Sequence, residues 1–146
     1  MPSPLIAAYL ATTYAYTGPD GVEVRLRVGE ANTSLGALMA ARAVAGAAFI
    51  TAFNPRSRPA APAVNEAAQA RLRAALETAG AEVFEGEGRG DGGGDGADWP
   101  PEPSFLALGL SFAEAGRLAV AFEQTAILYM GADAVPRLCL GYAGGV

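Results

Sequence analysis

Three short apolar runs constrain the fold of this chain more than any other feature of its sequence. Residues 47–53 read Ala-Ala-Phe-Ile-Thr-Ala-Phe, residues 104–110 read Ser-Phe-Leu-Ala-Leu-Gly-Leu, and residues 125–130 read Thr-Ala-Ile-Leu-Tyr-Met. Each run has the length of a β-strand and is far shorter than a membrane-spanning helix. Continuous apolar sequence is typical of strands covered on both faces. The runs therefore predict the centre of a sheet with helices packed on it.

The segments between these runs carry helix and strand signals. Helices are expected near residues 5–10, 32–44, 63–79 and 111–122. The last of these begins with Ser111 and Glu114 at the spacing of a capping box, and Gly80 is a natural C-cap for the third. Alternating or short apolar patterns predict further strands at residues 22–28, 81–86 and 137–141, the last forming a hairpin with residues 125–130.

Strands that alternate with helices, without an internal repeat, predict an α/β or α+β sandwich. We expect a single domain over residues 1–146, with a mixed central sheet of about five to six strands and three to four helices packed on it. Residues 87–98 are rich in Gly and Asp and predict a flexible loop within this domain.

The composition excludes several kinds of chemistry. The chain has no histidine, and all ten basic residues are arginine. A Ser–His–Asp or Cys–His catalytic group, a His-ligated metal, a Schiff base and a Walker lysine therefore cannot be built. We expect no metal and no cofactor, and any catalysis must use Asp, Glu, Arg, Tyr, Ser, Thr or Asn.

Charge and hydropathy bear on partners and location. The net charge of −5 argues against nucleic-acid binding, because phosphate neutralisation dominates that affinity. No apolar stretch suits a membrane partner, and the N-terminus lacks a basic signal region. The single cysteine, Cys139, has apolar neighbours and reads as a small buried side chain, with a catalytic thiol as the alternative. A cytoplasmic location is expected.

The end of the first apolar run is the first candidate site. Ligands of open α/β sheets bind beyond the carboxyl ends of the central strands. This rule selects Thr51, Asn54 and Arg56, together with Asn65 at the start of the next helix, as ligand-binding candidates. An arginine beside unpaired backbone N–H groups suits a phosphate or carboxylate. Alternatively, the asparagines cap turns and helices while the arginine faces solvent.

Three polar residues beside the other apolar runs complete the candidate set. Glu102 precedes the second run between two prolines, and Glu123 and Gln124 precede the third. Two carboxyl groups brought close together can divide acid and base roles, so Glu102 and Glu123 are the catalytic candidates and Gln124 a ligand-binding one. Alternatively, these residues pair with arginine or cap the backbone. Tyr9 and Tyr14 are expected to be core and rim aromatics.

Five segments carry a resemblance to a known family: residues 5–14, Phe49-Ile50-Thr51-Ala52-Phe53-Asn54-Pro55-Arg56-Ser57, Asn65 with the helix after it, Glu102-Pro103-Ser104-Phe105 and residues 122–127. Through them the chain resembles a bacterial family of proteins of unknown function, DUF3293. The most specific part of the resemblance is Thr-Ala-Phe-Asn-Pro, where a tryptophan in place of Phe53 would be expected. The resemblance implies that Thr51, Asn54, Pro55, Asn65, Glu102 and Gln124 occupy the family's motif positions. It implies no activity.

Two functions are consistent with these residues. The first is a domain that binds a small anionic metabolite in a polar pocket at the carboxyl end of the central strands, with Arg56 holding the anion and Glu102 or Glu123 transferring a proton. The second is a regulatory or protein-interaction module without catalytic activity, which could be a homodimer. Whether the chain is an enzyme is left open by its sequence.

Overall fold

The computed structural model describes residues 4–90 and 101–140, within which seven strands form one sheet. The elements in chain order are α1 (Pro4–Ala11), β1 (Thr13–Thr17), β2 (Glu23–Leu26), α2 (Thr33–Ala41), β3 (Ala47–Ile50), the 3-10 turn η1 (Pro55–Ser57), α3 (Pro62–Thr78), β4 (Glu82–Arg89), β5 (Glu102–Leu108), α4 (Phe112–Ala121), β6 (Ala126–Met130) and β7 (Arg137–Leu140). The strand order is β2-β1-β4-β5-β3-β6-β7. All six pairings are antiparallel.

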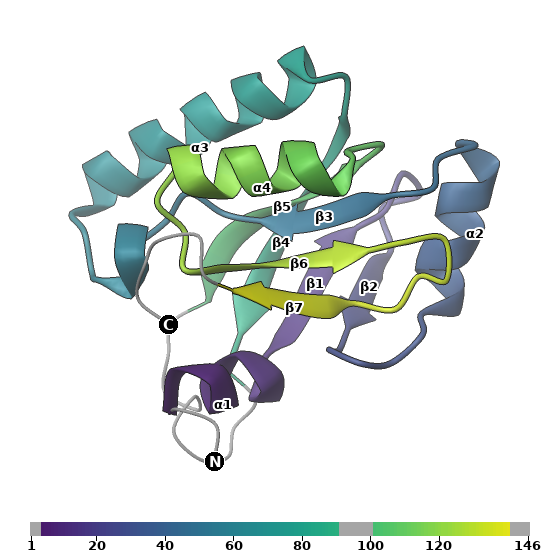
Figure 1. The fold of residues 1–146 in the computed structure, drawn as a ribbon, viewed down its shortest axis with the longest axis horizontal. Helices are drawn as coiled ribbons and strands as arrows, with labels where there is room; N and C mark the ends of the chain where they lie inside the picture. Colours follow the sequence, from purple (N-terminus) through teal and green to yellow (C-terminus); the bar gives the residue numbers. More distant parts are fainter. Residues whose placement is uncertain (1–3, 91–100, 141–146) are drawn as a thin grey trace.

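The central part of the chain is a β-α-β-β-α-β unit. It runs β3-α3-β4-β5-α4-β6, and its strands lie in the order β4-β5-β3-β6. This is the split βαβ arrangement of ferredoxin-like folds, in which each helix crosses over one intervening strand. Both helices lie on the same face of the sheet, as Figure 1 shows. The fold by itself implies no function.

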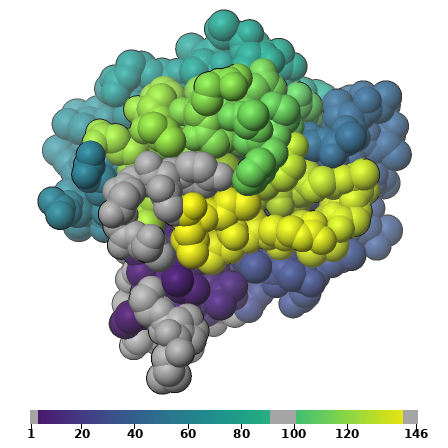
Figure 2. Space-filling view, in the orientation of Figure 1, coloured from purple at the N-terminus to yellow at the C-terminus, as the bar shows by residue number. Residues whose placement is uncertain are grey.

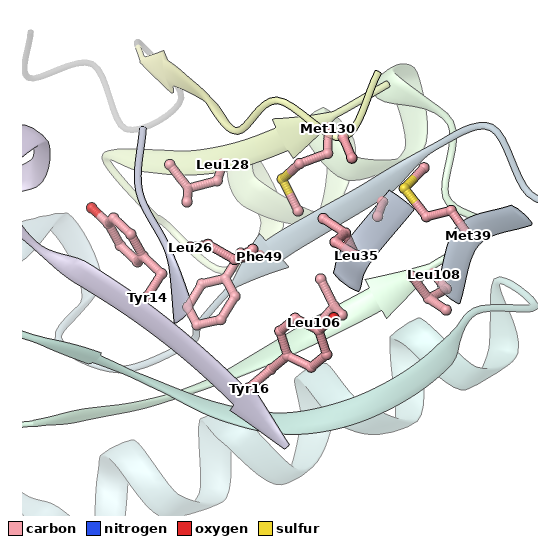
Figure 3. Close-up of a cluster of buried hydrophobic side chains, with 12 residues drawn as sticks. Tyr14, Tyr16, Leu26, Leu35, Met39, Phe49, Leu106, Leu108, Leu128 and Met130 are labelled. Carbon is pink, nitrogen blue, oxygen red and sulfur yellow. The ribbon is translucent and has the colours of Figure 1, made fainter. Parts of the chain in front are cut away.

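The central strands are buried on both faces, as the continuous apolar runs predicted. Alternate residues of β3 divide between two clusters, with Phe49 on one face and Ile50 on the other. The Ile50 side packs against α3 and α4 through Leu72, Leu76 and Ala115. Figure 3 shows the cluster on the opposite face, to which α2 contributes Leu35 and Met39. The labelled residues of this cluster are Tyr14, Tyr16, Leu26, Leu35, Met39, Phe49, Leu106, Leu108, Leu128 and Met130.

The sheet curls around this second cluster. The backbone N–H of Gly29, after β2, donates to the carbonyl of Pro136, before β7, at 2.8 Å, so the two edges of the sheet meet at one end. Gly86 permits the close approach of β4 to β1, because a Cβ there would lie 2.5 Å from the carbonyl oxygen of Ala15. At the other end α1 lies apart from α3 and α4 and opposite α2 (Figures 1 and 2).

Local sequence signals explain the helix boundaries. The capping box predicted for α4 is confirmed: the Ser111 hydroxyl accepts from the backbone of Glu114 at 3.1 Å, and the Glu114 carboxylate accepts from the backbone of Ser111 at 3.0 Å. Pro62 lies in the first turn of α3, where its missing N–H costs nothing. None of the helices in residues 4–90 and 101–140 is long and apolar enough to cross a membrane.

The α/β class with a central sheet is confirmed, but three sequence-based expectations need correction. The pairings are antiparallel and the sheet is not mixed, because each crossover helix joins two strands that have another strand, antiparallel to both, between them. Seven strands replace five to six, since β1 lies in a segment where the predicted helix merely ended. Residues 87–89, assigned to the Gly/Asp-rich loop, belong to β4, where they pair with β5 and β1. Gly90 follows β4, and residues 91–98 of the predicted loop and Gly141 fall outside the described residues.

Candidate functional site

Three chain segments that are distant in sequence meet at one end of the sheet. Ile50 at the end of β3 pairs with Phe105 of β5, and Phe49 pairs with Leu128 of β6. Because these pairings are antiparallel, the carboxyl end of β3 lies beside the amino ends of β5 and β6. The residues after Ile50 therefore adjoin those that precede β6 and those that begin β5.

A cavity of about 360 Å³ opens at this end. Its walls combine aromatic and aliphatic side chains from the concave face of the sheet with a few polar side chains from the three meeting segments and from α1. The residues that line it are Tyr9, Thr12, Tyr14, Phe49, Ile50, Thr51, Phe53, Asn54, Ser57, Pro59, Gly88, Gly90, Glu102, Ser104, Gln124, Ala126, Ile127, Leu128 and Leu138. The rings of Tyr14 and Phe49 meet edge to face, with centroids 5.4 Å apart (Figure 3).

Glu102 is the acidic group in this cavity wall. Its Oε2 accepts a hydrogen bond from the Asn54 side-chain amide at 3.2 Å, and its Oε1 bonds to none of the described residues. Burial raises the pKa of Glu102 to about 7, although the Asn54 hydrogen bond acts in the opposite direction. A carboxyl group that titrates near neutral pH can both accept and donate a proton under physiological conditions.

Asn54 is held by Asn65 from the first turn of α3. The Asn65 Oδ1 accepts from the backbone N–H of Asn54 at 2.8 Å, and the Asn65 amide donates to Asn54 Oδ1 at 2.9 Å. Asn54 Oδ1 also accepts from the backbone of Ala60 at 3.1 Å. With its amide nitrogen donating to Glu102, the Asn54 side chain is held through both its oxygen and its nitrogen. Asn65 itself does not line the cavity.

A second set of hydrogen bonds fixes the end of β3 to β5. The Thr51 hydroxyl donates to the Pro103 carbonyl at 2.7 Å, and the buried Gln69 of α3 donates to the same carbonyl at 3.1 Å. Gln69 Oε1 also accepts from the backbone of Ala52 at 2.8 Å. These bonds tie the strand that carries Asn54 to the strand that carries Glu102, so the relative position of the two side chains is fixed.

The segment that precedes β6 carries Glu123 and Gln124, and Arg56 of η1 lies beside it. The Gln124 amide lines the cavity but donates to the carbonyls of Phe53 and Phe122, both at 3.2 Å. Arg56 and Glu123 form an ion pair with each other at 2.9 Å. Their side chains are 58% and 51% exposed, and neither lines the cavity.

The backbone around the cavity mouth is strained. Asn54, Arg56, Ser57 and Glu123 all have left-handed φ angles, of 48°, 58°, 60° and 55°. Non-glycine residues pay of order 1 kcal/mol or more for this conformation, and such residues concentrate at ligand and active sites. The backbone N–H of Arg56 donates to the Glu123 carbonyl at 2.7 Å, which holds the two strained segments together.

A chain of three hydroxyl groups runs along the cavity mouth. Ser57 Oγ donates to the buried Thr125 Oγ1 at 2.8 Å and lies 3.2 Å from the Tyr9 hydroxyl. Tyr14, through its hydroxyl, donates to the Tyr9 carbonyl at 2.9 Å and so fixes the end of α1. Burial raises the pKa of Tyr9, and the charge of Glu102 acts in the same direction, so Tyr9 stays protonated and able to donate.

The structure brings four of the seven candidate residues to one cavity: Thr51, Asn54, Glu102 and Gln124. Asn65 lies outside the cavity and holds Asn54 through hydrogen bonds. Arg56 and Glu123 also lie outside the cavity and pair with each other. The residues that sequence reasoning missed are Tyr9, Ser57, Gln69 and Thr125. No local signal marks them, because Tyr9 meets Ser57 across 48 positions and Ser57 meets Thr125 across 68.

Within the described part of the chain, no three histidine, cysteine, aspartate or glutamate side chains gather where they could hold a metal ion. The chemistry that this site offers is proton transfer by Glu102 and hydrogen bonding by the amide and hydroxyl groups around it. Cys139 packs against the cluster under α3 and α4, and burial raises the pKa of its thiol.

Comparison with known proteins gives one match. The family model described as a protein of unknown function, DUF3293, matches residues 50–127, which span the end of β3, α3, β4, β5, α4 and the start of β6. No curated protein and no solved structure matches the chain. The matched region contains all seven candidate residues and most of the β-α-β-β-α-β unit, from the last residue of β3 to the first residues of β6, but not α1. This chain therefore belongs to the DUF3293 family of proteins of unknown function.

Proposed function

We propose that this domain binds a small, uncharged and mainly apolar molecule in the cavity at the open end of its curled sheet. The observation that carries the proposal is a partly buried carboxyl group, Glu102, in a wall of otherwise aromatic, aliphatic and neutral polar side chains. The cavity volume of about 360 Å³ falls in the range of small-molecule sites. Burying a carboxyl group without an ion-pair partner destabilises a fold, so function is the physical reason to keep it.

The charge of the wall favours an uncharged ligand over the anion that the sequence suggested. Among the described residues that line the cavity, none is basic, and Glu102 repels an anion when it is ionised. Arg56, the expected anion clamp, is engaged by Glu123 instead. An uncharged ligand with one polar atom can meet Glu102 Oε1 or a hydroxyl at the mouth while the rest of it contacts Phe49, Phe53 and Leu128.

The fluorescent compound 2-naphthol is a suitable probe, because it is small, bicyclic, uncharged at neutral pH and carries one hydroxyl. We expect the wild-type chain to bind 2-naphthol and to bind 2-naphthoate, of the same shape but anionic, at least about tenfold more weakly. Fluorescence titration at neutral pH measures both affinities. Equal affinity for the two compounds would contradict the charge argument.

A glycine in the wall provides the matched variants. A Cβ on Gly88 would lie 3.6 Å from Thr12, an ordinary contact, so a Gly88→Leu side chain fits the strand and fills the cavity. Gly131 has nothing within 4 Å of the same position and lies outside the wall, so Gly131→Leu is the control. Gly88→Leu is expected to abolish 2-naphthol binding and Gly131→Leu to retain it. Binding that survives Gly88→Leu would refute this site and leave the interaction-module alternative.

A further inference from the structure

We infer that this site catalyses proton transfer at a carbon next to a carbonyl group in a small apolar ketone, with Glu102 as the base and Tyr9 as the hydrogen-bond donor to the carbonyl oxygen. This inference rests on the proposed function, since the ketone must occupy the same cavity. It deepens that function by naming a substrate class and a reaction.

The geometry of Glu102 suits a base that acts on a C–H bond. Asn54 fixes one carboxylate oxygen at 3.2 Å, and Asn65 fixes Asn54, so the orientation of the carboxyl plane is set before a ligand enters. The second oxygen bonds to none of the described residues and belongs to a side chain of the cavity wall. An apolar wall keeps this oxygen poorly hydrated, which strengthens it as a base towards a carbon acid.

Tyr9 lies on the same cavity wall and can donate a hydrogen bond to the carbonyl oxygen of the ketone. Ser57 donates its proton to Thr125, so its oxygen is an acceptor for Tyr9, and rotation of the Tyr9 hydroxyl can turn that proton to a ligand oxygen instead. A donor of this kind stabilises the negative charge that develops on the oxygen when the neighbouring carbon loses its proton.

The step balances without any further reactant. The proton moves from the α-carbon to Glu102 Oε1, the C–H electron pair forms the carbon–carbon double bond of an enolate, and the carbonyl π pair moves to oxygen. Glu102 then returns a proton to the same carbon, which gives exchange, or to a conjugated one, which gives isomerisation. This reaction needs neither the histidine nor the lysine that the chain lacks.

Hydrogen–deuterium exchange of 1-tetralone tests the inference directly. This bicyclic ketone has one exchangeable α-carbon, and loss of its proton signal in D₂O is measured by NMR. We expect the wild-type chain to exceed the buffer rate, Glu102→Gln to lose at least about 100-fold of that excess, and Tyr9→Phe to lose about tenfold or more. Glu77→Gln, which removes an exposed carboxylate from α3, is the matched control and is expected to keep the wild-type rate.

The pH profile of the wild-type chain gives a test that needs no variant to fold. The exchange rate is expected to rise with pH and to level off above about 7, as Glu102 ionises. The other titratable groups on the wall, Tyr9 and Tyr14, have raised pKa values and stay neutral throughout. Exchange at the buffer rate while 2-naphthol still binds would overturn the inference and leave the proposed function. Absence of both would overturn the proposed function itself.

Discussion

Glu102 is the central residue of the proposed site, and its partial burial lowers the stability of the fold by an amount that can be measured. Its carboxyl group lies at the first position of β5, where the protein partly removes it from water and supplies one neutral hydrogen bond but no ion pair from the described residues. Burial therefore favours the protonated form. The consequence is a dependence of stability on pH that belongs to this residue.

Replacing Glu102 with Gln is expected to remove that dependence. The unfolded carboxyl group titrates near its ordinary value and the folded one at about 7, so between these values the folded state holds more protons and stability falls as pH rises. The loss is about 3 kcal/mol, complete above pH 7. Urea unfolding from pH 4 to 8 measures it, and Glu102→Gln should flatten the curve. Parallel curves for the two proteins would contradict the burial of Glu102.

Asn65 acts through Asn54 and is expected to be a stability residue. Asn65→Ala leaves the Asn54 backbone N–H without its partner and should lower the free energy of unfolding by about 1–3 kcal/mol. Glu66→Ala, at the next and exposed position of α3, is the control and should change it by less than about 0.5 kcal/mol. Urea unfolding of both variants checks this. Asn54→Ala should also destabilise, because Asn54 Oδ1 accepts from the Ala60 backbone and the Asn65 amide, which agrees with the alternative that the asparagines hold the local backbone.

At the scale of the elements, local signals in the sequence predicted helices well. The α4 capping box and the Gly80 end of α3 could be predicted because each depends on residues within one or two turns. The strand β1 was not predicted, although Tyr14 and Tyr16 alternate with Thr13, Ala15 and Thr17, because five residues directly after a helix are a weak signal without their pairing to β2 and β4. The extension of β4 to Arg89 likewise depends on partners, which override the turn propensity of Gly88.

A variant of the α4 cap is expected to lower the stability of the fold without changing ligand affinity. Ser111→Ala removes the hydroxyl that accepts from the Glu114 backbone and should cost about 1 kcal/mol of unfolding free energy. Because α4 packs on the face of the sheet away from the cavity, the affinity for 2-naphthol should stay unchanged. Urea unfolding and fluorescence titration of the same preparation test both parts. An affinity that falls with the stability would mean that the two faces are coupled.

At the scale of the whole molecule, the antiparallel topology creates the site. The sequence predicted ligand-binding residues after β3 by a rule for open α/β sheets, yet this sheet is antiparallel and the rule does not explain the result. Glu102 and Gln124 adjoin Asn54 because β5 and β6 begin where β3 ends. Strand order could not be predicted from one sequence, so neither could the meeting of Tyr9 with Ser57 nor the pairing of Arg56 with Glu123.

The curl of the sheet gives the cavity its depth. Contact between the segments that follow β2 and precede β7 closes one end around Leu35 and Met39, while the other end keeps room beside Phe49 and Leu128. A single chain thus has a packed core and an open pocket on the same face of its sheet. The account of function depends on that open end and on the carboxyl group in its wall.

A crystal structure of the chain with 2-naphthol tests this central claim most directly. The account predicts ring density between Phe49, Phe53 and Leu128, with the naphthol oxygen within hydrogen-bond distance of Glu102 Oε1 or the Tyr9 hydroxyl. Density for 2-naphthol only elsewhere on the molecule, or a cavity closed by its own side chains, would contradict it.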